Sequence, residues 1–232
     1  SVAARGVRGV EGPAVGGLSR NREHGLMASS DINFIGNTGI GGAYYVAVTN
    51  GNAGNQALND NEQFAFYGRF ELYYEDILRI GGATYYNELT DQNLADVINR
   101  EEFGLTGDIS AKISDFRLNV MYIRVQTDFP QIETQDSQVA EGFHVEFGYD
   151  VLGMGIIPAY RMAFFDPTSQ FEGLEQADSQ LEFDELTYHT VGVTWFVPRR
   201  PIKLQANYTF TIEDKARVFN NDRLELMGQL EF

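Results

Sequence analysis

Hydrophobic and polar residues alternate along most of the chain. In the segment "EQFAFYGRFELYYE", Phe66 and Phe70 occupy even-numbered positions, and Arg69 and Glu71 occupy odd-numbered positions. We call this odd or even position along a strand the parity of a residue. Successive side chains of an extended strand point to opposite faces, so a period of two indicates a strand with one apolar and one polar face. The final segment "RLELMGQLEF" has the same period. Helical periodicity competes nowhere, and the pattern therefore predicts an all-β chain.

The repeats of this pattern predict about eleven strands, at residues 24–35, 40–50, 62–75, 77–88, 102–113, 116–127, 139–150, 154–165, 186–197, 201–212 and 222–232. Tight turns are expected near 37–38, 75–76, 114–115, 152–153 and 198–201, and long polar loops at about 50–62, 88–101, 127–138, 166–186 and 212–222. Connections that alternate between short and long are typical of an antiparallel transmembrane β-barrel of the outer-membrane type. A soluble β-sandwich is the alternative, but it gives no reason for this alternation.

The charge of the chain is concentrated in the predicted loops. The sequence has 17 basic and 33 acidic residues, a net charge of -16, and more than half of the acidic residues fall in the five long loops. These acids either keep the loops soluble or bind cations. A chain this acidic lacks the basic surface that a nucleic-acid partner requires. The absence of cysteine is compatible with an oxidising compartment.

An odd number of strands has a topological consequence. If the last strand ends on the periplasmic side, the alternation of turns and loops places residue 24 at the extracellular end. A barrel inserted from the periplasm then needs at least one more strand before it. We therefore expect residues 24–232 to be the C-terminal strands of one longer barrel, and residues 1–23 to be a loop segment that is extracellular or folds inward.

Several segments resemble the C-terminal two thirds of the bacterial phosphate-selective porin (O and P) family, among them "REHGLMASSDIN", "GGAYYVAVTNGNAGN", "NDNEQFAFYGRFELY" and "PAYRMAFFDP". The resemblance spans nearly the whole chain. It lies in the general pattern of strand and loop segments and not in a catalytic motif. It implies a barrel of about 16 strands and a homotrimer in the outer membrane of a Gram-negative bacterium. The implied partners are outer-membrane lipid, lipopolysaccharide and the barrel assembly machinery.

The same resemblance suggests roles for residues at both ends of the chain. Counting back from a sixteenth strand puts residues 1–23 in the third extracellular loop, which folds into the channel in such porins. Arg5 and Arg8 are then candidate constriction residues. An aromatic last residue preceded by alternating apolar residues resembles the signal read by the insertion machinery, and here that signal comprises Phe232, Leu230, Leu226 and Leu224.

Charged residues of the opposite parity are expected to face the lumen of the barrel. The predicted pore-lining set is Arg69, Arg79, Lys112, Arg117, Arg161, Lys203, Glu71, Asp108 and Glu146. A ring of one sign selects ions of the other sign, so mixed signs predict only a weak preference. Each charge could instead be a solvated residue paired with a neighbour across the strands. Small residues on this face are expected to leave room for water, namely Gly104, Gly142, Gly148, Gly192 and Ala83.

The sequence offers no positive sign of catalysis. No serine occupies a GxSxG elbow, and His24, His144 and His189 lie on different predicted strands without metal-ligand spacing. We expect neither an enzyme nor a bound metal or cofactor. The predicted function is passive diffusion of small hydrophilic solutes or ions through a porin, with anions such as phosphate as candidates. The alternative is a non-channel outer-membrane barrel with a structural or adhesion role through its acidic extracellular loops.

Overall fold

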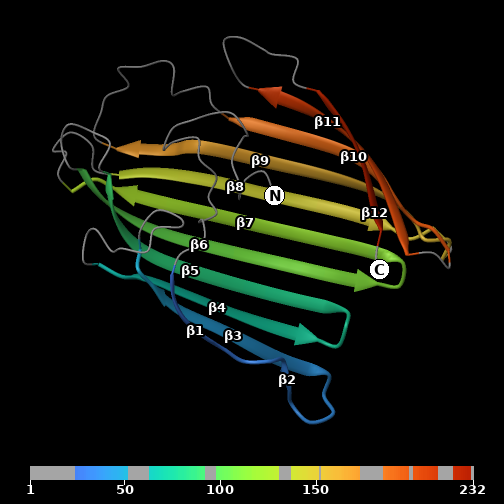
Figure 1. Cartoon of the computed structure of the whole chain (residues 1–232), viewed down its shortest axis with the longest axis horizontal. Helices are drawn as coiled ribbons and strands as arrows, with labels where there is room; N and C mark the ends of the chain where they lie inside the picture. Colours follow the sequence, from blue (N-terminus) through green and yellow to red (C-terminus); the bar gives the residue numbers. More distant parts are fainter. Residues whose placement is uncertain are drawn as a thin grey trace.

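The protein is described by a computed structural model, which covers residues 24–51, 63–91, 98–130, 137–151, 153–172, 185–198, 201–213 and 222–230. These residues form one antiparallel sheet, as the alternation predicted (Figure 1). Its strands are β1 (Gly25–Ser29), β2 (Asn33–Phe34), β3 (Ile40–Thr49), β4 (Ala65–Tyr74), β5 (Leu78–Asp91), β6 (Ile98–Ile113), β7 (Phe116–Asp128), β8 (Ser137–Tyr149), β9 (Ile156–Glu172), β10 (Leu186–Phe196), β11 (Ile202–Glu213) and β12 (Arg223–Leu230).

Strands that are neighbours in the sequence are neighbours in the sheet. The path runs β1-β3-β4-β5-β6-β7-β8-β9-β10-β11-β12, while β2 pairs with β3 beside β1. The path has the predicted eleven strands, because β1 and β2 together replace the single strand expected at residues 24–35. The sheet is not closed, and β1 and β12 form its edges. Every pairing on the path is antiparallel, so these two edge strands run in the same direction.

Two hairpins extend further than the apolar pattern indicated. The ladder between β5 and β6 continues through Glu88, opposite Glu101, to Asp91, opposite Ile98. Strand β9 also continues to Glu172, well into the loop expected at 166–186. Backbone hydrogen bonds hold a ladder together whatever the side chains are. Charged residues can therefore continue a strand beyond the apolar region, and the predicted starts of these two loops were wrong.

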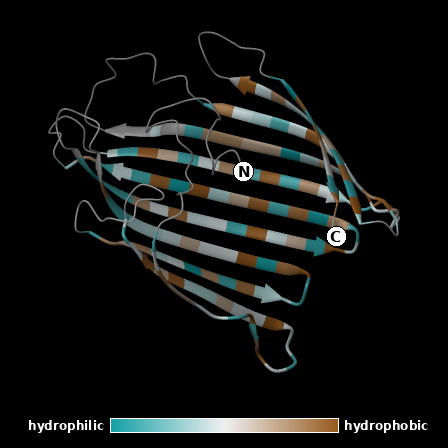
Figure 2. Ribbon diagram, viewed as in Figure 1, coloured by the Kyte–Doolittle hydropathy of each residue, from teal (hydrophilic) through white to brown (hydrophobic). Residues whose placement is uncertain are grey.

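The two faces of the sheet differ in exposure, as well as in polarity. We call the side that carries Phe66 and Phe70 the apolar face, and the side that carries Arg69 and Glu71 the polar face. The two phenylalanines are 52% and 55% exposed, whereas Glu71 is 5% exposed. Figure 2 shows the resulting alternation of hydrophobic and hydrophilic residues along the strands. Crowded side chains on one side and spread side chains on the other are what a curled sheet produces on its inner and outer surfaces.

The apolar face has a height that can be compared with that of a membrane. On β6 the exposed apolar residues run from Phe103 to Ile113, which is about 34 Å along a strand at about 3.4 Å per residue. A tilt of about 45° reduces this to about 24 Å, close to the roughly 25 Å apolar band of outer-membrane barrels. The described part of the chain contains no helix long and apolar enough to cross a membrane.

Polar side chains mark the end of this apolar band near the long loops. The Tyr86 hydroxyl donates to Glu88 at 2.8 Å and lies 3.3 Å from an oxygen of Glu101. On the next hairpin, Arg124 and Glu141 lie opposite each other, with 3.9 Å between Nε and Oε1. All of these polar residues lie on the apolar face. The hydrophobic band of that face therefore ends where they begin.

The C-terminal strand also presents its leucines on the apolar face. Leu224, Leu226 and Leu230 lie opposite Tyr208, Ala206 and Ile202, and the leucines are 66%, 75% and 60% exposed at the sheet edge. The parity predicted for the assembly signal is thus present up to Leu230. Phe232 lies outside the described residues, so its role stays a prediction.

Candidate functional site on the polar face

The sheet register aligns polar side chains from strand to strand. One continuous row of Cα partners crosses the polar face from β4 to β11, and it contains Tyr73, Arg79, Ser110, Asn119, Glu146, Arg161, Thr190 and Thr209. At the far end of the row, the buried hydroxyls of Thr190 and Thr209 lie 2.9 Å apart. Strand pairing therefore brings residues that are distant in the sequence to one level of the sheet.

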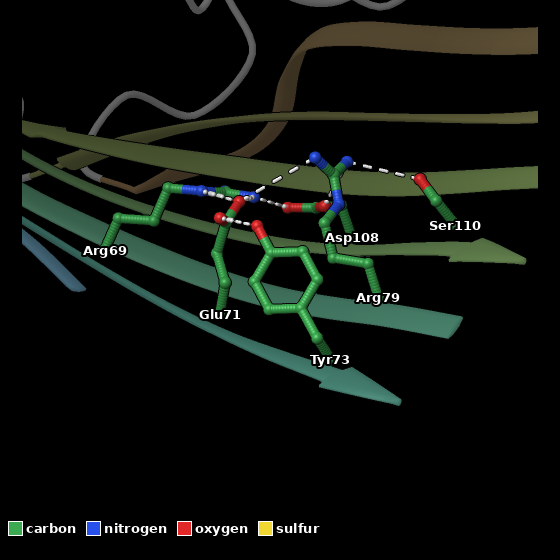
Figure 3. A network of polar contacts seen from close by, with 6 residues as sticks. All are labelled: Arg69, Glu71, Tyr73, Arg79, Asp108 and Ser110. Atoms are coloured by element: carbon green, nitrogen blue, oxygen red, sulfur yellow. Dashed lines mark hydrogen bonds and ion pairs between the residues drawn. The ribbon is translucent and has the colours of Figure 1, made fainter. Parts of the chain in front are cut away.

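Four of the predicted pore-lining residues form a single ion-pair network beside this row (Figure 3). Arg69 contacts Oε1 of Glu71 through Nε at 2.9 Å and through Nη2 at 2.7 Å. The same Nη2 lies 2.7 Å from Oδ2 of Asp108, two strands away on β6. A guanidinium that bridges two carboxylates in this way is held more firmly than one in a simple pair.

Arg79 completes the network from β5. Its Nη2 lies 3.1 Å from Oδ1 of Asp108 and 3.2 Å from the Ser110 hydroxyl, and its Nη1 lies 3.8 Å from Glu71. The Tyr73 hydroxyl donates to the second carboxylate oxygen of Glu71. Two guanidinium groups and two carboxylates balance in charge. The network therefore carries no net charge and contributes little net field to this face.

A glycine makes room for the network. Gly81 on β5 lies between Glu71 and Asp108 in the register. A side chain at this position would occupy the space of the Arg69 guanidinium and the Asp108 carboxylate. The absence of a side chain at residue 81 thus allows Arg69 to reach across β5 to β6.

The remaining predicted pore-lining residues lie on the polar face but outside this network. Lys112 and Arg117 are direct cross-strand partners and both are exposed. Glu146 and Arg161 are also direct partners, yet no ion pair of 4 Å or less joins them within the described strands. Lys203 lies over the ring of Phe196, with Nζ 5.8 Å from the ring centroid. The predicted constriction residues Arg5 and Arg8 fall outside the described residues.

An apolar cluster on the polar face was not predicted. Ile123, Val125, Phe165 and Leu186 pack together there, and each is at most 6% exposed. Their parity on β7, β9 and β10 is that of the charged residues, and they lie nearer the long loops than the ion-pair network does. On β7, β9 and β10 the polar face therefore becomes apolar toward the long loops, whereas on β6 it carries the Arg100–Glu102 ion pair there.

The expectation that small residues on this face leave room for water was wrong for three of them. The ring of Tyr85 lies over Gly104, so that a side chain at residue 104 would overlap it. The Asn207 amide fills the space beside Gly192, and Ile157 approaches Gly148. These glycines admit neighbouring side chains, and the described part of the polar face is correspondingly more filled than the sequence suggested.

Sequence reasoning also missed members of the network itself. Tyr73 and Ser110 share the parity of Arg69 and Asp108, and that parity was the available signal. The predicted pore-lining set contains only charged residues, so it does not include these two hydroxyl side chains. Among the described residues, no group of three His, Asp or Glu side chains is placed to hold a metal ion.

Comparison with known proteins adds no family to this description. A scan of the chain against protein-family models finds no match, and a search among curated proteins finds no significantly similar sequence. The interpretation of the polar face therefore rests on its own geometry.

Proposed function

We propose that this chain forms part of an outer-membrane β-barrel whose polar face lines a passage for small hydrophilic solutes or ions. The observation that carries the proposal is the division of side chains between the two faces. One face exposes aromatic and aliphatic residues over about 24 Å of height, which suits contact with the apolar part of a bilayer. The other face carries paired ions and hydroxyls, which suit contact with water.

The proposed passage is a diffusion channel, with no catalytic step. Its ion-pair network is neutral, because Arg69 and Arg79 are matched by Glu71 and Asp108. A network of balanced signs adds only a weak preference for either sign of ion. The trimeric state, the lipid and lipopolysaccharide contacts and the barrel assembly machinery belong to the same proposal.

Cysteine accessibility tests the proposal well because these 232 residues contain no cysteine. Asn119 and Val120 are neighbours on β7 and point to the polar and apolar faces. After insertion of the full-length protein into planar bilayers, we expect stepwise conductance. A charged methanethiosulfonate reagent should change the conductance of Asn119→Cys and leave that of Val120→Cys unchanged. Silent membranes, or the opposite pattern of modification, would refute the channel.

A second candidate is a barrel that does not conduct and acts through its acidic loops. The buried cluster around Phe165 favours it, because apolar side chains packed on an inner wall reduce the space available for water. Conductance separates the two candidates. If Phe165→Ala opens a silent barrel to ions, the wild-type lumen is closed at this cluster and the second candidate is correct.

A further inference from the structure

A groove lies on the polar face at the end near the short turns. It has a volume of about 540 Å³ and crosses the region from β2 to β7. This volume is within the range of about 300–1,000 Å³ that small-molecule sites occupy. The groove is separate from the apolar cluster near the long loops, and it touches the ion-pair network only through Tyr73, Arg79 and Ser110.

One side of the groove is cationic. Lys112 and Arg117 line it, and they are direct cross-strand partners on β6 and β7. Like charges in this position destabilise a sheet. Neither side chain has a carboxylate within 4 Å in the described part of the chain. A bound anion would relieve the repulsion between them, and the amide of Asn119, which also lines the groove, offers a neutral hydrogen-bond donor beside Arg117.

The other side of the groove is apolar. Ile32 and Phe34 lie over Gly41 on the polar face, and they are 43% and 52% exposed. A third apolar residue, Ile77, is 39% exposed and lies on the cationic side, where its carbonyl accepts a backbone hydrogen bond from Lys112 at 2.8 Å. Exposed apolar side chains that lie together indicate a binding surface more often than scattered exposure does.

Two acidic residues at the β4–β5 turn, Glu75 and Asp76, also line the groove. The Glu75 side chain packs against Gly39, away from the cationic pair. Neither acid forms an ion pair of 4 Å or less with Lys112 or Arg117 among the described residues. The turn thus limits the anionic charge that the groove accepts, and it favours a single carboxylate over a polyanion.

We propose that this groove binds organic monoanions with an apolar body, of which an aromatic carboxylate is the simplest example. The carboxylate lies between Lys112 and Arg117, and the ring packs on Phe34 and Ile32. The proposal rests on the proposed channel function, because it names the class of solute that the channel takes up at its short-turn mouth.

Binding is measured by isothermal titration calorimetry of the full-length protein folded in detergent, with benzoate, benzyl alcohol and inorganic phosphate as probes. We expect benzoate to bind more tightly than either other probe, since only benzoate uses both sides of the groove. Replacing Lys112 and Arg117 by alanine should weaken benzoate binding by about ten-fold or more, as expected for lost charge-assisted hydrogen bonds. Phe34→Ala should weaken benzoate binding and leave phosphate unaffected.

Lys203→Ala is the matched control, because Lys203 is a cation of the same face but lies on β11 against Phe196. Its benzoate affinity should equal that of the wild type. Tighter binding of phosphate than of benzoate, or an unchanged affinity in the double variant, would overturn the proposal. The measurement needs no ion flow. A protein that conducts without binding benzoate disproves the groove alone, and one that binds benzoate in silent membranes disproves the channel alone.

Discussion

The Arg69–Glu71 ion pair has a matched counterpart elsewhere in the sheet. Arg223 and Glu225 on β12 have the same spacing along a strand and the same polar parity, with 3.2 Å between Nε and Oε1. They differ in environment: the side chains of Arg69 and Glu71 are 27% and 6% exposed, and those of Arg223 and Glu225 are 58% and 46% exposed. Alanine double-mutant cycles on the two pairs therefore isolate the effect of burial.

The expected coupling energies follow from the distances and exposure. At 2.7 Å and an effective dielectric constant of about 20, the attraction between Arg69 and Glu71 is about 6 kcal/mol. Desolvation of the two charges offsets most of this attraction. In addition, Arg69 stays paired with Asp108 when Glu71 is removed, which lowers the coupling energy further. We expect about 2 kcal/mol of coupling. For Arg223 and Glu225, water reduces the attraction to about 1 kcal/mol, and side-chain entropy leaves about 0.3 kcal/mol.

The free energies of unfolding are measured by urea titration of the protein refolded into lipid vesicles, for the wild type, the two single variants and the double variant of each pair. Salt provides a second check, because the exposed pair should lose its coupling at about 1 M salt while the buried pair keeps most of its own. Coupling energies within about 0.5 kcal/mol of each other would show that burial does not strengthen the Arg69–Glu71 pair.

Three other predictions concern packing, selectivity and assembly. Gly81→Ala should lower the unfolding free energy by about 1–3 kcal/mol, because its Cβ meets the guanidinium and carboxylate beside it; Gly107→Ala, with no atom near its Cβ, is the control and should be nearly neutral. Replacing both Arg5 and Arg8 by alanine should shift the reversal potential in a salt gradient toward cations, and an unchanged potential would remove them from the constriction. Phe232→Ala should strongly reduce the amount of folded protein in outer membranes, while the unfolding free energy of the assembled protein falls by only about 2 kcal/mol, the contribution of one buried side chain. A normal amount of folded protein in the membrane would contradict this prediction.

The alternation of residues was sufficient to predict the class of the fold and the face of each residue. Arg69 and Asp108 were assigned to one face from parity alone, and the register confirms that assignment. Their contact could not be predicted. It depends on the register of two hairpins, and a shift of one residue would move each side chain to the opposite face. The role of Gly81 becomes visible only when that register is known.

The interruption between β1 and β2 shows a second limit. The apolar pattern continues from Leu26 to Ile35, but the ladder is broken after Ser29. The Ser30 hydroxyl accepts a hydrogen bond from the Tyr44 backbone at 3.0 Å, and Phe34 turns its ring over Gly41. Beyond Ser30, the Asn33 side-chain amide donates to the Asp31 carbonyl at 2.9 Å. A local hydrogen bond of this kind competes with the strand, and periodicity does not register it.

Parity gives the face of a residue but not its depth or its neighbours. Phe165 and Arg161 have the same parity on β9, yet the first is 1% exposed in an apolar cluster and the second lies in a polar row. The difference comes from the adjacent strands. Gly142 and Leu186 are the partners of Phe165, whereas Glu146 and Thr190 are those of Arg161. The apolar part of the polar face therefore arises from several strands together and could not be found in any one of them.

The net charge of the chain is a poor guide to the charge of the groove near the short turns. On β6, Glu101 near the long loops and Lys112 near the short turn are about 37 Å apart along the strand. At about 0.15 M salt this separation is more than four Debye lengths of roughly 8 Å, so the acidic loops are largely screened from the groove. Between them lies the neutral network of Arg69, Glu71, Arg79 and Asp108. Within the groove, Glu75 packs against Gly39 and neither it nor Asp76 is within 4 Å of the two cations in the described part of the chain, so the anion that we propose would lie beside Lys112 and Arg117 despite the acidic net charge.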